Sequence, residues 1–245
     1  MSKLELHQDI VRYYYCSKKV HVLYFFVRLK SLGNGRVHMK QSEMADLLGV
    51  TTRTIRYNLR HCINEGLVDY DSTTHKIYLA SNDRVLDKIG FTGYRNKNQY
   101  IVIEDKYLGT KSDFDLFCFS ILNSIECEKR KKWLNKRDKN VPTDESNEGY
   151  RAEWVHLSCA TAAKYAKRSL MTASRKKRLA KVKGLLNLKP CFRLIKGLSP
   201  LLAAFYTDSR GERKRLLVKG DKVYERLADI YISGIYGTQK LLYKK

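Results

Sequence analysis

The sequence lacks any apolar run close to the roughly 20 residues that a membrane-spanning helix needs, and its opening residues contain no signal-peptide core. Its six cysteines include no Cys-x-x-Cys pair, and the histidines do not cluster with them. These absences argue against a zinc site, and they predict a protein of the reducing cytoplasm that does not insert into membranes.

The motifs of several enzyme classes are also missing. The chain contains no phosphate-binding loop, no His-x-His metal pair and no Gly-x-Ser-x-Gly turn. Its 17 tyrosines offer nucleophiles in principle, but no Arg/His/Tyr constellation of a strand-transfer enzyme accompanies them. We therefore expect a protein that is not an enzyme and that uses no metal or cofactor.

Acidic residues are scarce relative to basic ones. The chain has 25 Asp and Glu against 48 Lys and Arg, which gives a formal net charge of +23. Because such an excess attracts polyanions, nucleic acid is the first candidate partner and an anionic membrane surface is the second. With 43% apolar residues among 245, the chain can still bury one large core or two modest ones.

One stretch, residues 42–68, has the pattern of two helices joined by a tight turn. Ser42 can cap the first helix, and Gly49 can adopt the left-handed conformation that ends it. Val50 is expected to be buried in the turn, and Thr51 or Thr52 to cap the second helix. Apolar residues at helical spacing predict an inward stripe of Ile55, Leu59 and Ile63.

This stretch resembles the winged helix-turn-helix family of DNA-binding proteins. Ala45, Gly49 and Ile55 match the small residue, the turn glycine and the branched apolar residue of the family pattern. Asn58 departs from it, because an apolar residue is often found there. A preceding apolar helix, a short strand at residues 37–39 and a β-hairpin wing extend the resemblance over about residues 17 to 80.

The resemblance implies that the second helix enters the major groove of DNA. Arginine can bond guanine through two hydrogen bonds, and threonine can touch a thymine methyl group or a phosphate. A solvated face on a fold used for protein contact is the alternative interpretation. The candidate DNA-binding residues of this unit are Thr51, Thr52, Arg53, Thr54, Arg56, Tyr57, Arg60, His75 and Lys76.

A weaker copy of the pattern follows 118 residues further on, with seven identities in the 31 positions from 37 to 67. Lys167 replaces the turn glycine, and an unrelated basic helical domain is the alternative interpretation. The expected inward residues of its second helix are Met171, Leu179, Val182 and Leu186. The candidate DNA-binding residues of the copy are Lys167, Arg168, Ser169, Thr172, Ser174, Arg175, Lys176 and Arg178.

Residues 203–220 read as the wing of this copy, with strands around Phe205 and Tyr206 and at residues 216–218. A helix over residues 221–233 would then close the domain. A basic wing tip suits contact with phosphates or with the minor groove. The candidate tip residues are Arg210, Arg213, Lys214 and Arg215.

We predict a mainly α fold with small β-hairpins (α+β), built as two tandem winged helix-turn-helix units. Residues 1–92 form the first domain, and residues 93–245 form a strongly basic domain with a long leading helix and a flexible segment at 141–150. The charge is uneven: residues 33–80 carry six basic and five acidic residues, whereas residues 151–219 carry 18 and three. Their nets of +1 and +15 predict that the second unit supplies most binding to phosphates.

The leading prediction is a sequence-specific double-stranded DNA-binding protein that regulates transcription in the cytoplasm, associated with the nucleoid if the source is prokaryotic or phage. The alternative is a replication initiator of a plasmid or phage that binds origin repeats through two winged helices. In such initiators the first unit commonly pairs protomers, so a homodimer through the N-terminal unit is the alternative to a monomer. Duplex RNA is less favoured, because its deep major groove does not admit a helix.

Overall fold

A computed structural model describes most of the chain. The described residues are 4–33, 35–93, 95, 99–138, 155–207 and 216–234. The predicted flexible segment at 141–150 lies outside them, as do the four tip residues Arg210, Arg213, Lys214 and Arg215. Across the described part, no helix has the length and apolar character needed to cross a membrane.

The described residues form helices and small antiparallel sheets, as expected for the predicted α+β class. The helices are α1 (Gln8–Cys16), α2 (Val20–Leu32), α3 (Gln41–Leu48), α4 (Thr52–Asn64), α5 (Asn82–Lys88), η2 (Asp105–Tyr107), α6 (Lys111–Asp138), α7 (Cys159–Ala166), α8 (Leu170–Val182) and η4 (Pro200–Phe205). The strands are β1 (Leu4–His7), β2 (Arg36–His38), β3 (Val68–Asp71), β4 (Lys76–Leu79), β5 (Tyr100–Ile103), β6 (Val155–Leu157), β7 (Leu186–Lys189), β8 (Phe192–Leu194), β9 (Leu216–Lys219), β10 (Lys222–Arg226) and β11 (Asp229–Gly234). They pair in the orders β1-β5, β2-β4-β3, β6-β11-β7 and β8-β10-β9.

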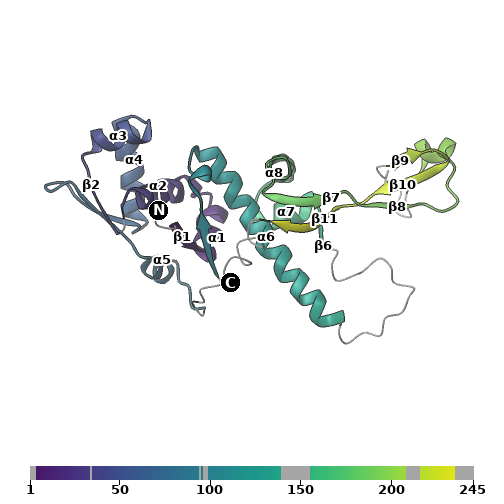
Figure 1. The fold of residues 1–245 in the computed structure, drawn as a ribbon, viewed down its shortest axis with the longest axis horizontal. Helices are drawn as coiled ribbons and strands as arrows, with labels where there is room; N and C mark the ends of the chain where they lie inside the picture. Colours follow the sequence, from purple (N-terminus) through teal and green to yellow (C-terminus); the bar gives the residue numbers. More distant parts are fainter. Residues whose placement is uncertain are drawn as a thin grey trace.

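Three parts follow one another along the molecule (Figure 1). The first unit, residues 36–79, lies at one end, and α6 runs obliquely through the middle. The second unit, which comprises residues 155–189 and β11, lies beyond α6, and β8, β9 and β10 form the end opposite the first unit. Because α6 packs against α1 and α2 as well as α7, α8 and β11, one continuous core joins the two units.

The first unit has the predicted order of strand, helix, turn, helix and hairpin. Its central strand β4 pairs with β2 and with β3, and Ile77 of β4 faces both Val37 and Tyr70. α3 and α4 pack against each other, and α2 packs against α4. The predicted first strand, second helix and wing of this unit are therefore confirmed at the level of secondary structure.

The start of α3 and the turn after it differ from the prediction. α3 begins one residue before Ser42, and the Glu43 carboxylate accepts the backbone N–H of Lys40 over 2.9 Å. Gly49 ends α3 in the left-handed conformation, as predicted. Val50 is 39% exposed rather than buried. The turn is closed by backbone hydrogen bonds from Gly49 and Val50 to the last turn of α3, so it does not need a buried Val50 side chain.

The inward face of α4 also needs one correction. Ile55 and Leu59 are buried as predicted, but Ile63 is 42% exposed and Cys62 is buried in its place. Seven residues bring an α-helix back to within roughly 20° of its starting direction, whereas eight residues overshoot it by roughly 80°. Cys62 therefore continues the line of Ile55, and Ile63 does not.

The second unit repeats the first at the predicted offset of 118 residues. α7, α8 and β7 begin and end at the positions that correspond to α3, α4 and β3. β11 takes the place of β4, because it lies between β6 and β7 and pairs with both. The same backbone order of strand, helix, turn, helix and two further strands therefore occurs twice.

The segment that closes the second unit is not the predicted helix. Residues 221–233 form β10 and most of β11 instead. Along β10, Val223 and Glu225 are buried while the alternate positions are more exposed, which is the period of a strand. Val223, Leu227 and Ile230 matched helical spacing, but pairing with β6, β7, β8 and β9 decides the structure.

The wing of the second unit is an inserted sheet rather than a simple hairpin. Residues 216–218 lie in β9, which pairs with β10. Phe205 and Tyr206, predicted in a strand, end and cap the short helix η4. Ser199 accepts the backbone N–H of Leu201 at the start of η4, where Pro200 supplies a φ suited to a first turn.

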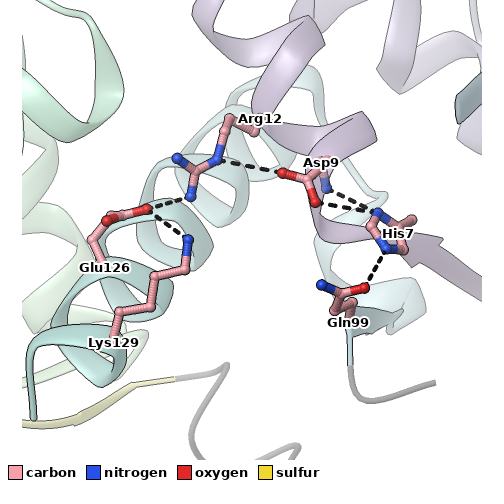
Figure 2. Close-up of polar contacts among 6 residues, drawn as sticks. All are labelled: His7, Asp9, Arg12, Gln99, Glu126 and Lys129. Atoms are coloured by element: carbon pink, nitrogen blue, oxygen red, sulfur yellow. Dashed lines mark hydrogen bonds and ion pairs between the residues drawn. The ribbon is translucent and has the colours of Figure 1, made fainter. Parts of the chain in front are cut away.

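The N-terminal strand and helix are fixed to the middle of the molecule. β1 pairs with β5, which follows the predicted domain boundary at residue 92. Nε2 of the buried His7 donates to Gln99 Oε1 over 3.1 Å, and its Nδ1 accepts the backbone N–H of Asp9 over 3.3 Å (Figure 2). Arg12 of α1 bonds Glu126 of α6, so α1, β5 and α6 form one frame.

Candidate nucleic-acid interface

The start of α4 is built by two hydroxyl groups. Thr51 Oγ1 accepts the backbone N–H of Thr54 over 3.2 Å, and the two side-chain oxygens lie 2.9 Å apart. Both side chains are exposed, whereas Thr52 is half-buried. Thr51 is therefore the cap of α4, one of the two threonines that the sequence offered, and its bond with Thr54 fixes the first turn.

Four of the predicted residues form one exposed surface of α4, which we name the α4 face: Arg53, Arg56, Tyr57 and Arg60. Arg56 Nε donates to Oε1 of Gln41, at the start of α3, over 3.2 Å. This bond uses only Nε, so the guanidinium is oriented while its two terminal amino groups stay available to a ligand. The Tyr57 ring packs edge-on against His61, with the centroids 4.3 Å apart. Gln41 was not predicted, because an isolated glutamine before a helix carries no distinctive signal.

The wing of the first unit has a hydrogen-bonded tip but is not strongly basic. Its tip turns on Asp71, whose carboxylate accepts the backbone N–H of Thr73 over 2.9 Å and also bonds Thr74. These hydrogen bonds, led by the one from the Thr74 side chain, lower the pKa of Asp71. His75 and Lys76 are half-buried beside this anion, and Lys76 is the cross-strand partner of Asp71. The wing therefore presents mixed charge to any partner.

The start of α8 has the same construction as that of α4. Ser169 Oγ accepts the backbone N–H of Thr172 over 3.3 Å, and the two hydroxyl oxygens lie 2.9 Å apart. Lys167 adopts the left-handed conformation, with φ 47° and ψ 51°, where Gly49 of the first unit has φ 63° and ψ 38°. The predicted residues that are exposed around α8 are Lys167, Ser169, Ser174, Arg175 and Arg178.

Two of the predicted cations bond to other parts of the protein. Arg168 Nη2 donates to the Tyr15 backbone oxygen over 2.9 Å, and its guanidinium lies 4.3 Å from the centre of the Tyr15 ring. Lys176 Nζ donates to Tyr15 Oη over 2.9 Å and forms an ion pair with Asp115 of α6. Both side chains are only partly exposed, and together they hold the second unit against α1 and α6.

The buried side of α8 differs from the predicted stripe. Leu186 is buried in β7 as predicted, but Met171, Leu179 and Val182 are exposed. The residues that do face inward are Ala173, Lys177 and Ala180, at the positions of Ile55, Leu59 and Cys62. A search for large apolar residues at helical spacing does not find these three positions, because two hold alanine and the third holds a charged lysine.

Lys177 is buried because it has a charged partner in β11. Its Nζ lies 2.8 Å from Asp229 Oδ2, and Arg226 bonds the other carboxylate oxygen. Burial alone would raise the pKa of Asp229, but the bonds from the two cations outweigh it and the net shift is downward. This triad joins α8 to the strand that carries the inserted wing. Nothing in the local sequence around Lys177 predicts it, since Asp229 lies far along the chain.

Other chemistry in the described residues is limited. Within these ranges, no three His, Cys, Asp or Glu side chains gather in a way that would hold a metal ion. A shallow cavity of about 500 Å³ lies between η2, the start of α6 and the end of α8. Two lysines line it, and each is paired: Lys106 with Glu104, and Lys183 with Asp113.

Comparisons with protein-family models, with curated proteins and with solved structures found no match to this chain. The function is therefore inferred from the two capped helices, the side chains they expose and the charge around them.

Proposed function

We propose that this chain is a sequence-specific double-stranded DNA-binding protein that regulates transcription through two winged helix-turn-helix units. The observation that carries the proposal is the repeated backbone. Two helix pairs have the same bounds, the same left-handed turn and the same hydroxyl cap, and both second helices expose arginine side chains. In a helix-turn-helix, the residues near the start of the second helix contact base edges in the major groove.

The side chains of the α4 face fit this role. Arginine presents a fixed fork of donors that matches the two acceptors of guanine in the major groove. The hydrogen bond that Arg56 donates to Gln41 holds the guanidinium in place before DNA binds, which reduces the entropy lost on binding. Arg53 and Arg60 lie on the same exposed face, where they reach either bases or phosphates.

The second unit supplies the stronger electrostatic attraction. Residues 151–219 have a net charge of +15, and the cations that face solvent there include Lys167, Arg175 and Arg178. Each phosphate contact releases counterions and so strengthens binding at low salt. Arg168 and Lys176 contribute less to this attraction, because each bonds within the protein.

A replication initiator remains the second candidate. The first unit is close to neutral and has three exposed apolar side chains in its helix pair, Leu47, Val50 and Ile63. Both features favour a first unit that contacts another protomer, as in initiators. Repeated target sites at an origin and a tight dimer in sedimentation would support this role, whereas a single operator near a promoter supports regulation.

The test is selection of bound sequences from a random duplex pool with the full chain. The enriched duplex should then bind at least about a thousandfold more tightly than a shuffled duplex at the same salt concentration, measured by fluorescence anisotropy. An A-form RNA duplex of the same sequence is the control and should bind no better than the shuffled DNA. Equal affinity for all three duplexes would contradict the proposal.

A further inference from the structure

The first turn of α8 exposes two large apolar side chains. Leu170 is 58% exposed and Met171 is 83% exposed, and both follow directly after the cap residue Ser169. At the offset of 118 residues they occupy the positions of Thr52 and Arg53 in α4. The two helices therefore present different chemistry at the same place on the same backbone.

Neither side chain is needed to build α8. The cap is made by Ser169 and Thr172, and the inward face is made by three other residues: Ala173, Lys177 and Ala180. Single exposed apolar residues are common, but two adjacent ones at the start of a helix leave a sizeable apolar surface in water. A binding partner that covers this surface would gain the free energy of burying it.

The proposed binding of α8 in the major groove indicates which apolar group of DNA could cover this surface. If α8 enters the major groove as a second helix does, Leu170 and Met171 lie at the end of the helix that meets base edges. The C5-methyl group of thymine is the apolar group on the floor of that groove. A methionine side chain is long and flexible enough to adapt to it, and it has no donor for the acceptors of guanine.

We infer that the two helices read different bases: Met171, with Leu170 beside it, contacts thymine methyl groups, while Arg56 and Arg53 of α4 contact guanine. The inference rests on the proposed function and adds the specificity of each unit. The target is then a composite site, with guanine where α4 lies and thymine where α8 lies.

The experiment uses the full chain and the duplex enriched by selection, with each thymine replaced in turn by uracil, which lacks only the methyl group. The wild-type chain should lose about fourfold in affinity at one or two positions, the size expected for one buried methyl group. Met171→Ala should bind the thymine and uracil duplexes equally, and Met171→Leu should keep the difference. Val182→Ala is the matched control, because Val182 is 79% exposed at the other end of α8 and should leave the ratio unchanged.

Two results would overturn the inference without touching the proposed function. One is specific binding of the enriched duplex with no effect of any uracil substitution. The other is a thymine preference that Met171→Ala leaves intact. If the chain instead fails to prefer any duplex, the proposed function itself fails, and the apolar surface belongs to a protein contact.

Discussion

The two units of this protein have the same backbone and differ in what they place on it. The helix pairs begin and end at corresponding residues, and both second helices have a hydroxyl cap. Yet the buried position of Leu59 in one unit is held by Lys177 in the other, and the left-handed turn is made by Gly49 in one and by Lys167 in the other. The same helix pair therefore forms with different residues at the turn and in the core, and a buried charge is tolerated where a partner meets it.

The charge difference between the units has a second lesson. The nets of +1 and +15 over residues 33–80 and 151–219 predict that the second unit supplies most of the binding to phosphates. The structure divides the charge of that unit, because Lys176 and Lys183 pair with Asp115 and Asp113 of α6. Some of the excess charge thus serves to dock the second unit on α6.

The largest expected effect comes from breaking the buried pair. Lys177→Ala should lower the free energy of unfolding by about 3–5 kcal/mol, because it leaves the carboxylate of Asp229 buried with one partner fewer. Leu59→Ala at the corresponding position should cost about 2–5 kcal/mol through a cavity. Urea unfolding followed by circular dichroism measures both. The double variant Lys177→Ala with Asp229→Asn should recover part of the free energy of unfolding that Lys177→Ala loses. If it recovers none, the charge pair does not have this role.

The two positions should also respond differently to pH. The folded-state pKa of Asp229 is lowered, so its contribution to stability is complete above its unfolded pKa of about 4 and is lost as the pH falls through the folded-state value. The difference between wild type and Lys177→Ala should therefore shrink in acid, below about pH 4. The stability difference between wild type and Leu59→Ala should not shrink over this pH range, because Leu59 lies in the other unit and has no ionisable group.

A smaller effect is expected where the second unit meets α1 and α6. Lys176→Gln should reduce the free energy of unfolding by about 1–3 kcal/mol, because Asp115 and Tyr15 lose a charged hydrogen-bond donor. Its neighbour Arg175 is exposed, so Arg175→Gln should change stability by less than about 0.5 kcal/mol. For DNA binding the order reverses: Arg175→Gln should flatten the salt dependence by about 0.9 if it contacts one phosphate. Equal salt slopes for the two variants would refute this division of roles.

The smallest effect concerns the turn. A Cβ added at Gly49 would meet no atom within 4 Å, so Gly49→Lys should cost mainly the left-handed backbone strain of about 1–2 kcal/mol. Lys167→Gly should raise the free energy of unfolding by less than about 1 kcal/mol, because the greater freedom of glycine in the unfolded chain offsets part of the relief. Thermal unfolding of both variants checks this, and a destabilised Lys167→Gly would show that the lysine side chain is needed there.

Local signals in the sequence were sufficient for the helix pairs. Gly49 marked the first turn, the threonine pair Thr51 and Thr52 marked the following cap, and the offset of 118 residues located the second unit despite few identities. These features depend on residues close together in the chain, so propensity and capping predict them. The exposed residues of the α4 face followed from the same helical period.

Contacts between residues far apart in the sequence could not be predicted from local signals. Residues 221–233 fit a helical period, but β10 and β11 are fixed by strands far away in sequence. Lys177 was not expected on the inward face of α8, where it meets Asp229, and the predicted DNA-binding residues Arg168 and Lys176 bond to Tyr15 instead. In each case the residue that makes the contact lies on another helix or strand, so the sequence around the lysine or arginine cannot predict the contact.

Sequence-specific binding by this protein depends most on base readout by the α4 face, and a double-mutant cycle between Arg56 and its base pair tests that readout directly. On the enriched duplex, Arg56→Ala should weaken binding by about 1–3 kcal/mol. On a duplex in which the one guanine pair read by Arg56 is replaced, the same substitution should cost nothing, while discrimination at the other base pairs persists. An equal loss on both duplexes would reduce Arg56 to a phosphate contact and contradict sequence reading through α4.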